Sequence, residues 1–467
     1  MVFSSTIFLF TFLPVVWLVN RFLPRLISNW FLCIASLFFY AWGEPVFVFM
    51  LVAVVAINYF VALGLKHPRF KKVLLLTGVA ANIGTLSFYK YADFAVETFN
   101  MLPRIDMPLP GIMLPIGISF FIFQAISYLI DVYRGESTSQ KSFIKLLLYI
   151  SFFPQLTAGP IIYYHDIQKQ IEERRVTTDN TAMGIRRFII GLSKKVLIAN
   201  SLGVVVDAVY ALEFSYLSLP VSWIGALAYI LQLYHDFSGY SDMALGLAMM
   251  FGFQFKENFD YPYISSSVQE FWRRWHISLS GWFKRYVYIP LGGNRRGELR
   301  TIINKVTVFF LTGLWHGAQW TFVVWGLIHG ALLLLEQVLK PIIRPGKGMK
   351  WLGVVYTLLA VTFAFVLFRS ESFTQAIVII RNMLSGSLNI GIQSQLITPL
   401  FITAFCAGVI GSLPWVHMVK RKVESGMPGT AGKALSIGSY IASIALLVLC
   451  LLSLSSATHN PFIYFRF

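Results

Sequence analysis

The sequence lacks the short motifs that identify several large enzyme classes. It contains no Gly-x-Ser-x-Gly elbow, no Walker-type phosphate loop, no dinucleotide-binding glycine pattern and no His-Glu-x-x-His. Hydrolases of the nucleophile-elbow type, ATPases, dehydrogenases and zinc proteases are therefore disfavoured. Cysteine is also scarce: Cys33, Cys406 and Cys450 fall within apolar runs, without the spacing of a zinc site or a redox pair, and no metal site is expected.

Charge is scarce too, because only 13% of the 467 residues are charged and 57% are hydrophobic, with a mean hydropathy of +0.68. A soluble fold of this length could not bury so much apolar side chain, so a bilayer must take the surplus. There is no internal repeat, no low-complexity linker and no soluble domain. Residues 1–467 are therefore predicted to form a single membrane domain.

Apolar runs long enough to cross a bilayer, at about 17 to 25 residues each, recur along the chain. Val2 to Asn20 has no basic n-region and no cleavage site, so it is expected to stay as an anchor. Pro154, Pro160 and Lys194-Lys195 interrupt other runs and predict short, tilted or re-entrant helices. We predict an all-α integral membrane protein with roughly 10–12 transmembrane helices plus interfacial and re-entrant helices. The runs lie near 3–20, 45–65, 73–91, 111–130, 143–163, 186–212, 221–252, 304–335, 351–368, 396–416 and 434–456, with a further crossing over Trp30 to Trp42.

The net charge of +17 comes from basic residues in short loops between these runs, which indicates membrane topology and no nucleic-acid partner. The basic loop Lys66 to Lys72 is predicted to be cytoplasmic. The next loop, Asp93 to Pro110, is richer in acids and is predicted to lie outside.

The polar exception is the segment 251–305, which the same charge rule places on the cytoplasmic side. Within it, one face of a predicted continuous helix is apolar and aromatic, from Val268 to Tyr286, and the other is basic, which is typical of a helix in the membrane interface. The basic face suits the phosphates of an anionic ligand, and lipid headgroups equally well. His276 lies at the edge of the apolar face, where a packed or headgroup-facing histidine is as plausible as a functional one.

His316 lies deep in the apolar run that follows, between Gly313 and Gly317. An ionisable residue at that depth is expensive to keep and is a functional candidate by default. A small-residue packing site with a hydrogen-bonded histidine explains the pattern equally well. His329 would face another way on a continuous helix and is predicted to be structural.

A second polar cluster, Tyr234 to Asp242, interrupts the run 221–252. Asp236, Asp242 and His235 at membrane depth must be paired or must face water. They could line a pathway or hold helices in register, and the pattern does not choose between these roles.

Several motifs resemble the membrane-bound O-acyltransferase (MBOAT) family, most closely its alginate O-acetylase branch. They are Gln269-Glu270-Phe271-Trp272-Arg273-Arg274-Trp275-His276-Ile277-Ser278-Leu279-Ser280, Tyr288-Ile289-Pro290-Leu291-Gly292-Gly293-Asn294-Arg295, Leu114 to Phe120, Ala158-Gly159-Pro160, Asp236 to Met243, Leu314-Trp315-His316-Gly317-Ala318 and Phe462 to Phe467.

The resemblance implies a polytopic fold around a central tunnel, with His316 as the intramembrane catalytic residue and His276 as the second functional one. It also implies acetyl transfer from a cytoplasmic thioester donor, acetyl-CoA or another, with no bound cofactor. The acetyl group would cross the bacterial inner membrane to a separate extracytoplasmic acetyltransferase that modifies an exported polysaccharide such as alginate, peptidoglycan or cellulose. Residues expected to contact substrate or donor are Arg273, Arg274, Trp275, Asn294, Arg295, Trp315, Asp236 and Asp242.

Two positions depart from the usual family pattern: Arg285, where an acid is common, and His235, where an aromatic is common. His316 is expected to act as the general base, kept neutral by burial, while His276 orients a substrate or relays a proton. Three alternatives stay open: a teichoic-acid D-alanyl transferase subunit, an ion- or proton-coupled transporter, and an inactive scaffold.

Overall fold

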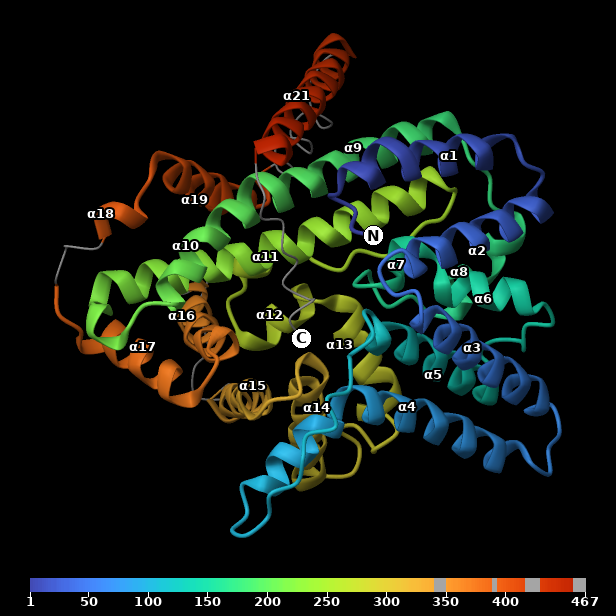
Figure 1. Cartoon of the computed structure of the whole chain (residues 1–467), viewed down its shortest axis with the longest axis horizontal. Helices are drawn as coiled ribbons and strands as arrows, with labels where there is room; N and C mark the ends of the chain where they lie inside the picture. Colours follow the sequence, from blue (N-terminus) through green and yellow to red (C-terminus); the bar gives the residue numbers. More distant parts are fainter. Residues whose placement is uncertain (340–349, 389–392, 416–428, 457–467) are drawn as a thin grey trace. The chain divides into compact units, whose positions relative to one another are not determined.

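The computed structural model describes residues 1–339, 350–388, 393–415 and 429–456 (Figure 1). The regular elements in these ranges are all helices, which confirms the all-α prediction. Contacts divide the chain into two compact units, Met1–Ile185 with Met243–Lys256, and Arg186–Asp242 with Glu257–Phe467. The single domain over 1–467 stays a prediction, and the terminal motif Phe462 to Phe467 lies outside the described residues.

The first unit is built from α1 to α8. Its α5 is bounded by two glycines in the left-handed region, Gly117 (φ 78°) and Gly135 (φ 76°), which only glycine adopts without strain. In its apolar interior, Asn58 and Asn82 exchange amide hydrogen bonds of 3.0 and 2.9 Å between α3 and α4. The helices are α1 (Leu13–Phe22), α2 (Arg25–Ala41), α3 (Phe47–Gly64), α4 (Lys71–Asn100), α5 (Ile118–Arg134), α6 (Phe143–Ser151), α7 (Phe153–Leu156) and α8 (Tyr164–Glu173), with a π-helix η1 (Phe8–Phe12) before α1.

The second unit carries the remaining helices. The first residues of α9, up to Ile185, and the last residues of α11, from Met243, belong to the first unit. The elements are α9 (Thr178–Ser193), η2 (Lys194–Ala199), α10 (Asn200–Tyr210), η3 (Phe214–Tyr216), α11 (Leu219–Met250), η4 (Pro262–Ile264), α12 (Val268–Arg274), α13 (Ile277–Phe283), η5 (Lys284–Tyr288), α14 (Glu298–His316), α15 (Trp320–Leu339), α16 (Lys350–Arg369), α17 (Phe373–Ser385), α18 (Gln393–Leu396), α19 (Pro399–Gly411) and α21 (Gly429–Ser456).

Six helical stretches in the described part of the chain are long and apolar enough to cross a membrane, so the chain is a multi-pass membrane protein. Three shorter apolar helices join them at Phe8–Phe22, Arg25–Ala41 and Pro399–Gly411. The total of 10–12 crossings and the central tunnel stay predictions. The six are Phe47–Gly64, Lys71–Asn100, Thr178–Tyr210, Trp320–Leu339, Lys350–Arg369 and Ile437–Ser455.

The predicted interruption of the run 143–163 at Pro154 is confirmed, because α6 ends at Ser151 and Pro154 lies in the first turn of the short α7. Two other expectations about continuity change. The run 304–335 is two helices, since α14 ends at His316 and α15 begins at Trp320. By contrast, the polar cluster Tyr234 to Asp242 does not interrupt its run but lies inside the continuous α11.

Glycines let α14 and α15 cross closely. A Cβ on Gly313 would collide with the backbone carbonyl oxygen of Phe322, and one on Gly326 would collide with that of Phe309. The small-residue packing that was one of the two explanations for the pattern around His316 is therefore present. This crossing places the end of α14, and with it His316, against α15.

Candidate active site

The second unit brings His276 and His316 together. Their ring centroids lie 6.4 Å apart with the planes at 69°, and the two residues are 0% and 4% exposed. This separation is too long for a direct hydrogen bond between the imidazoles. Two buried histidines from α14 and from the α12–α13 segment thus face one small region.

The prediction of one continuous interfacial helix over Val268 to Tyr286 is wrong. The chain ends α12 at Arg274 and restarts α13 at Ile277, and His276 between them adopts the left-handed region (φ 44°, ψ 55°). A histidine there costs energy, and such strain persists only where the surroundings enforce it. The side chains of the predicted apolar face are buried within the protein, so the break re-aims His276 without losing the aromatic packing.

Asn258 holds this strained turn. Its backbone oxygen accepts from the Ile277 N–H (2.9 Å), and its side-chain Oδ1 accepts from the N–H and the hydroxyl of Ser278 (3.0 and 2.9 Å). Asn258 is 1% exposed, so these donors have no water to replace it.

The same amide fixes the tautomer of His276. Because Asn258 Oδ1 receives a backbone N–H, it is an acceptor, and the His276 Nδ1 that faces it at 3.4 Å must be the donor. The lone pair then resides on Nε2, which has no hydrogen-bond partner among the described residues. His276 lies between α12 and α13, neither of which is among the candidate spans, and burial lowers its pKa to about 3. It is therefore a neutral imidazole that presents an acceptor nitrogen.

Aromatic rings wall the site. Trp315 contacts both histidines, with ring centroids 5.6 Å from His276 and 4.9 Å from His316. Phe237 of α11 packs at 4.7 Å from His276. Trp325 of α15 and Phe368 of α16 pack at 5.0 and 5.3 Å from His316. Such walls exclude water and strengthen the electrostatic interactions between groups inside.

The two predicted acids of α11 form ion pairs. Asp236 Oδ1 lies 2.7 Å from Lys195 Nζ, with both side chains at most 3% exposed. Asp242 pairs with Lys194 at 2.7 Å and with Arg187 at 2.8 Å. Of the two possibilities left open, pairing or facing water, the structure shows pairing, and the pairs favour a register role, tying α9 and the π-helix η2 to α11. Substrate contact by either acid stays a prediction.

The predicted donor-binding residues lie in several environments. Arg273 is exposed, while Arg274 pairs with Glu270 (3.0 Å) and Asp260 (2.9 Å). Trp275 is buried, with its ring 5.3 Å from that of Phe271. Two further candidates, Asn294 and Arg295, are exposed in the loop before α14. Of the predicted contact residues, only Trp315 packs its ring against both histidine rings.

Among the described residues, two further buried histidines have partners elsewhere. His329 Nδ1 accepts from the Trp272 indole N–H at 3.2 Å. His235 Nε2 lies 2.8 Å from the Gly408 carbonyl oxygen and so donates to α19. The half-buried Arg285 guanidinium lies 5.7 Å from the Tyr286 ring centroid. The structural role of His329 remains a prediction that its bond favours, and the bond of His235 to α19 favours the role of holding helices in register.

Sequence reasoning missed Asn258. Its segment, Glu257-Asn258-Phe259-Asp260, has no helical or strand periodicity, and nothing in the pattern joins it to His276. An asparagine in a turn-rich stretch ahead of a histidine motif is the only signal, because asparagine side chains commonly bond nearby backbone.

A multi-pass helical protein with two buried histidines in an aromatic site has the features of a membrane-embedded acyltransferase. The sequence pattern of the membrane-bound O-acyltransferase family matches residues 134–374, and the chain belongs to this family and is an O-acyltransferase.

Three relatives indicate the branch. A probable alginate O-acetylase of Pseudomonas putida is 38% identical over 491 aligned residues, covering 100% of both chains. A peptidoglycan O-acetyltransferase of Helicobacter pylori is 36% identical over 82% of this chain and 80% of its own. A teichoic acid D-alanyltransferase of Bacillus subtilis is 28% identical over 58% of this chain and 72% of its own.

Proposed function

We propose that this chain transfers acetyl groups for O-acetylation of an exported polysaccharide, in the cytoplasmic membrane of a bacterium. The observation that carries the chemistry is the pair His276 and His316, 6.4 Å apart behind aromatic walls. The relatives named for alginate and peptidoglycan acetylation match at 36–38% identity over at least four fifths of the chain. This favours acetyl over D-alanyl as the group transferred.

In the proposed reaction, an acceptor hydroxyl oxygen attacks the carbonyl carbon of an acetyl thioester. The new C–O bond forms as the C–S bond breaks, and the hydroxyl proton must leave while the thiolate gains one. His316 is the proposed base for that proton, since neutral imidazole suits the role near neutral pH. His276, with its lone pair on Nε2, orients the hydroxyl or relays the proton.

The donor is proposed to be acetyl-CoA or another acyl thioester from the cytoplasm. Exposed Arg273 and Arg295 are available for its phosphates, whereas Arg274 is already engaged by Glu270 and Asp260. The acetyl group would cross the membrane to a separate extracytoplasmic acetyltransferase that completes modification of the polymer.

Two other functions are outcomes of the same test. The first is D-alanyl transfer, the activity named for the Bacillus subtilis relative, for which the donor would be a carrier protein. A transporter would move ions without any donor, but the paired Asp236 and Asp242 leave that reading little support.

The experiment uses the full chain in proteoliposomes with labelled acetyl-CoA on the cytoplasmic face and an acceptor on the other. Label appearing on the acceptor supports the proposal. Label that is transferred only from an acylated carrier protein would show that the carrier protein, and not acetyl-CoA, is the donor. Ion flux without any donor would overturn the transferase proposal.

A further inference from the structure

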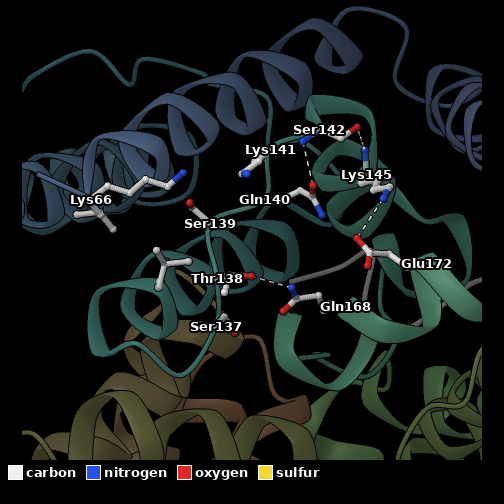
Figure 2. Close-up of a pocket in the computed structure, with 12 residues that line it drawn as sticks. Lys66, Ser137, Thr138, Ser139, Gln140, Lys141, Ser142, Lys145, Gln168 and Glu172 are labelled. Carbon is white, nitrogen blue, oxygen red and sulfur yellow. Dashed lines mark hydrogen bonds and ion pairs between the residues drawn. The ribbon is translucent and has the colours of Figure 1, made fainter.

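The first unit contains an open groove of about 860 Å³, lined only by residues of that unit (Figure 2). It is formed by the end of α3, the loop between α5 and α6, and the facing side of α8. The loop contributes the continuous polar stretch Ser137 to Ser142. The two histidines are not among its lining residues, so the groove is separate from the candidate active site.

The groove carries unbalanced positive charge. Lys66, Lys141 and Lys145 line it together with a single acid, Glu172. Lys145 Nζ is paired with Glu172 at 3.0 Å. The side-chain ammonium groups of Lys66 and Lys141 have neither an ion-pair nor a hydrogen-bond partner among the described residues, and Figure 2 shows both ammonium ends directed into the same open space. Two ammonium groups facing one groove repel each other unless an anion lies between them.

The polar loop is held in a fixed shape. Gln140 Oε1 accepts from the Ser142 N–H (2.9 Å), and Gln140 Nε2 donates to the Tyr164 hydroxyl (2.7 Å). The Thr138 hydroxyl accepts from the amide of Gln168 at 2.9 Å. The buried Ser137 hydroxyl has no hydrogen-bond partner in the part of the chain that the structure describes. A preformed loop with hydroxyl and ammonium donors suits the oxygens of a phosphate group.

The groove lies at one end of a spanning helix. Lys66 follows the last residue of α3, Gly64, by two positions, and α3 is one of the six candidate spans. The loop Lys66 to Lys72 is the one predicted to be cytoplasmic, and the apolar side chains of Leu65 and Val132 also line the groove. Basic pockets at the cytoplasmic ends of membrane helices are suited to anionic lipid headgroups.

We propose that this groove binds the phosphate headgroup of an anionic phospholipid of the cytoplasmic leaflet. Lys66 and Lys141 hold the phosphate, the hydroxyls of the loop complete its shell, and the partly exposed Val132 meets the start of the acyl chains. A soluble phosphate compound would use the same ammonium groups, but it has no need for a site at the end of a span with apolar lining.

The test measures the binding of phosphatidylglycerol by the purified full chain, by native mass spectrometry and by thermal shift. Lys66→Gln/Lys141→Gln is compared with Lys72→Gln/Lys169→Gln, which removes the same charge from exposed positions outside the groove. The groove variant is expected to bind the lipid roughly 30-fold more weakly, at about fivefold per lysine. Lys66→Arg/Lys141→Arg keeps both positive charges. If this variant binds the lipid normally, the weaker binding of the glutamine variant comes from the lost charges and not from a misfolded loop.

Two results would overturn the proposal. One is equal retention of phosphatidylglycerol by the groove variant and the control variant. The other is protection by inorganic phosphate or coenzyme A that depends on Lys66 and Lys141 while phosphatidylglycerol vesicles give none, because the ligand would then be a soluble phosphate compound.

Discussion

Replacing Asn258 with leucine would separate the role of His276 in transfer from its role in packing. Leucine has nearly the same size but removes the oxygen that accepts from Ser278 and from His276 Nδ1. Each buried donor left without a partner costs about 1–3 kcal/mol. The left-handed backbone of His276 stores about 1–3 kcal/mol more that the turn must continue to hold.

The larger effect should be on transfer, because His276 would be free to adopt either tautomer and to turn its acceptor nitrogen away. General acid–base contributions are about 10²–10⁴-fold, so we expect kcat to fall by about 10²–10³-fold with KM little changed. Asn258→Asp keeps an acceptor oxygen at this position and should recover most of the activity. The assay is labelled acetyl transfer at saturating donor with each variant.

Asn82→Leu is the matched control. It also removes a buried asparagine amide, here one bonded to Asn58 in the first unit, and should lower the unfolding temperature without lowering kcat. The reasoning is refuted if Asn258→Leu keeps wild-type kcat, or if Asn258→Leu and Asn82→Leu lose activity only in proportion to lost stability.

Further predictions concern the helix contacts around the site. Asp236→Asn leaves Lys195 buried without its counter-ion and should destabilise the protein by about 3–5 kcal/mol. Lys195→Met/Asp236→Leu should recover much of this loss, and thermal unfolding in detergent checks both variants. Losses of stability that simply add in the double variant would contradict the pairing. Gly313→Ala should cost about 1–3 kcal/mol and reduce transfer, because its Cβ collides with Phe322 backbone, while Gly438→Ala on α21 meets nothing and should be silent. Equal unfolding temperatures for the two glycine variants would show that α14 and α15 do not need the close crossing.

Much of the fold follows from the sequence, because long apolar runs in a bilayer have few alternatives to helices. Hydropathy alone does not show which apolar side chains are exposed, nor that polar pairs such as Asn58–Asn82 are buried. Helix continuity was harder to predict. The aromatic and basic periodicity over Val268 to Tyr286 fits one helix, and only the bonds from Asn258 show why the chain breaks at His276.

The candidate site was predicted from its histidines but not from its supporting contacts. The depth of His316 in an apolar run makes it a functional candidate from the sequence, whereas the functional prediction for His276 depends on resemblance to a known family. The ion partners of Asp236 and Asp242 are Lys194, Lys195 and Arg187, which precede α11 in the chain. A sequence pattern shows the charges on both segments, but their pairing depends on how α9 and η2 pack against α11.

The most direct test of the central claim is acetyl transfer by His316→Ala and His276→Ala in proteoliposomes, with folding verified for each. The account predicts that label reaches the acceptor with the wild type, stops with His316→Ala and falls strongly with His276→Ala. Normal transfer by a well-folded His316→Ala protein would contradict it.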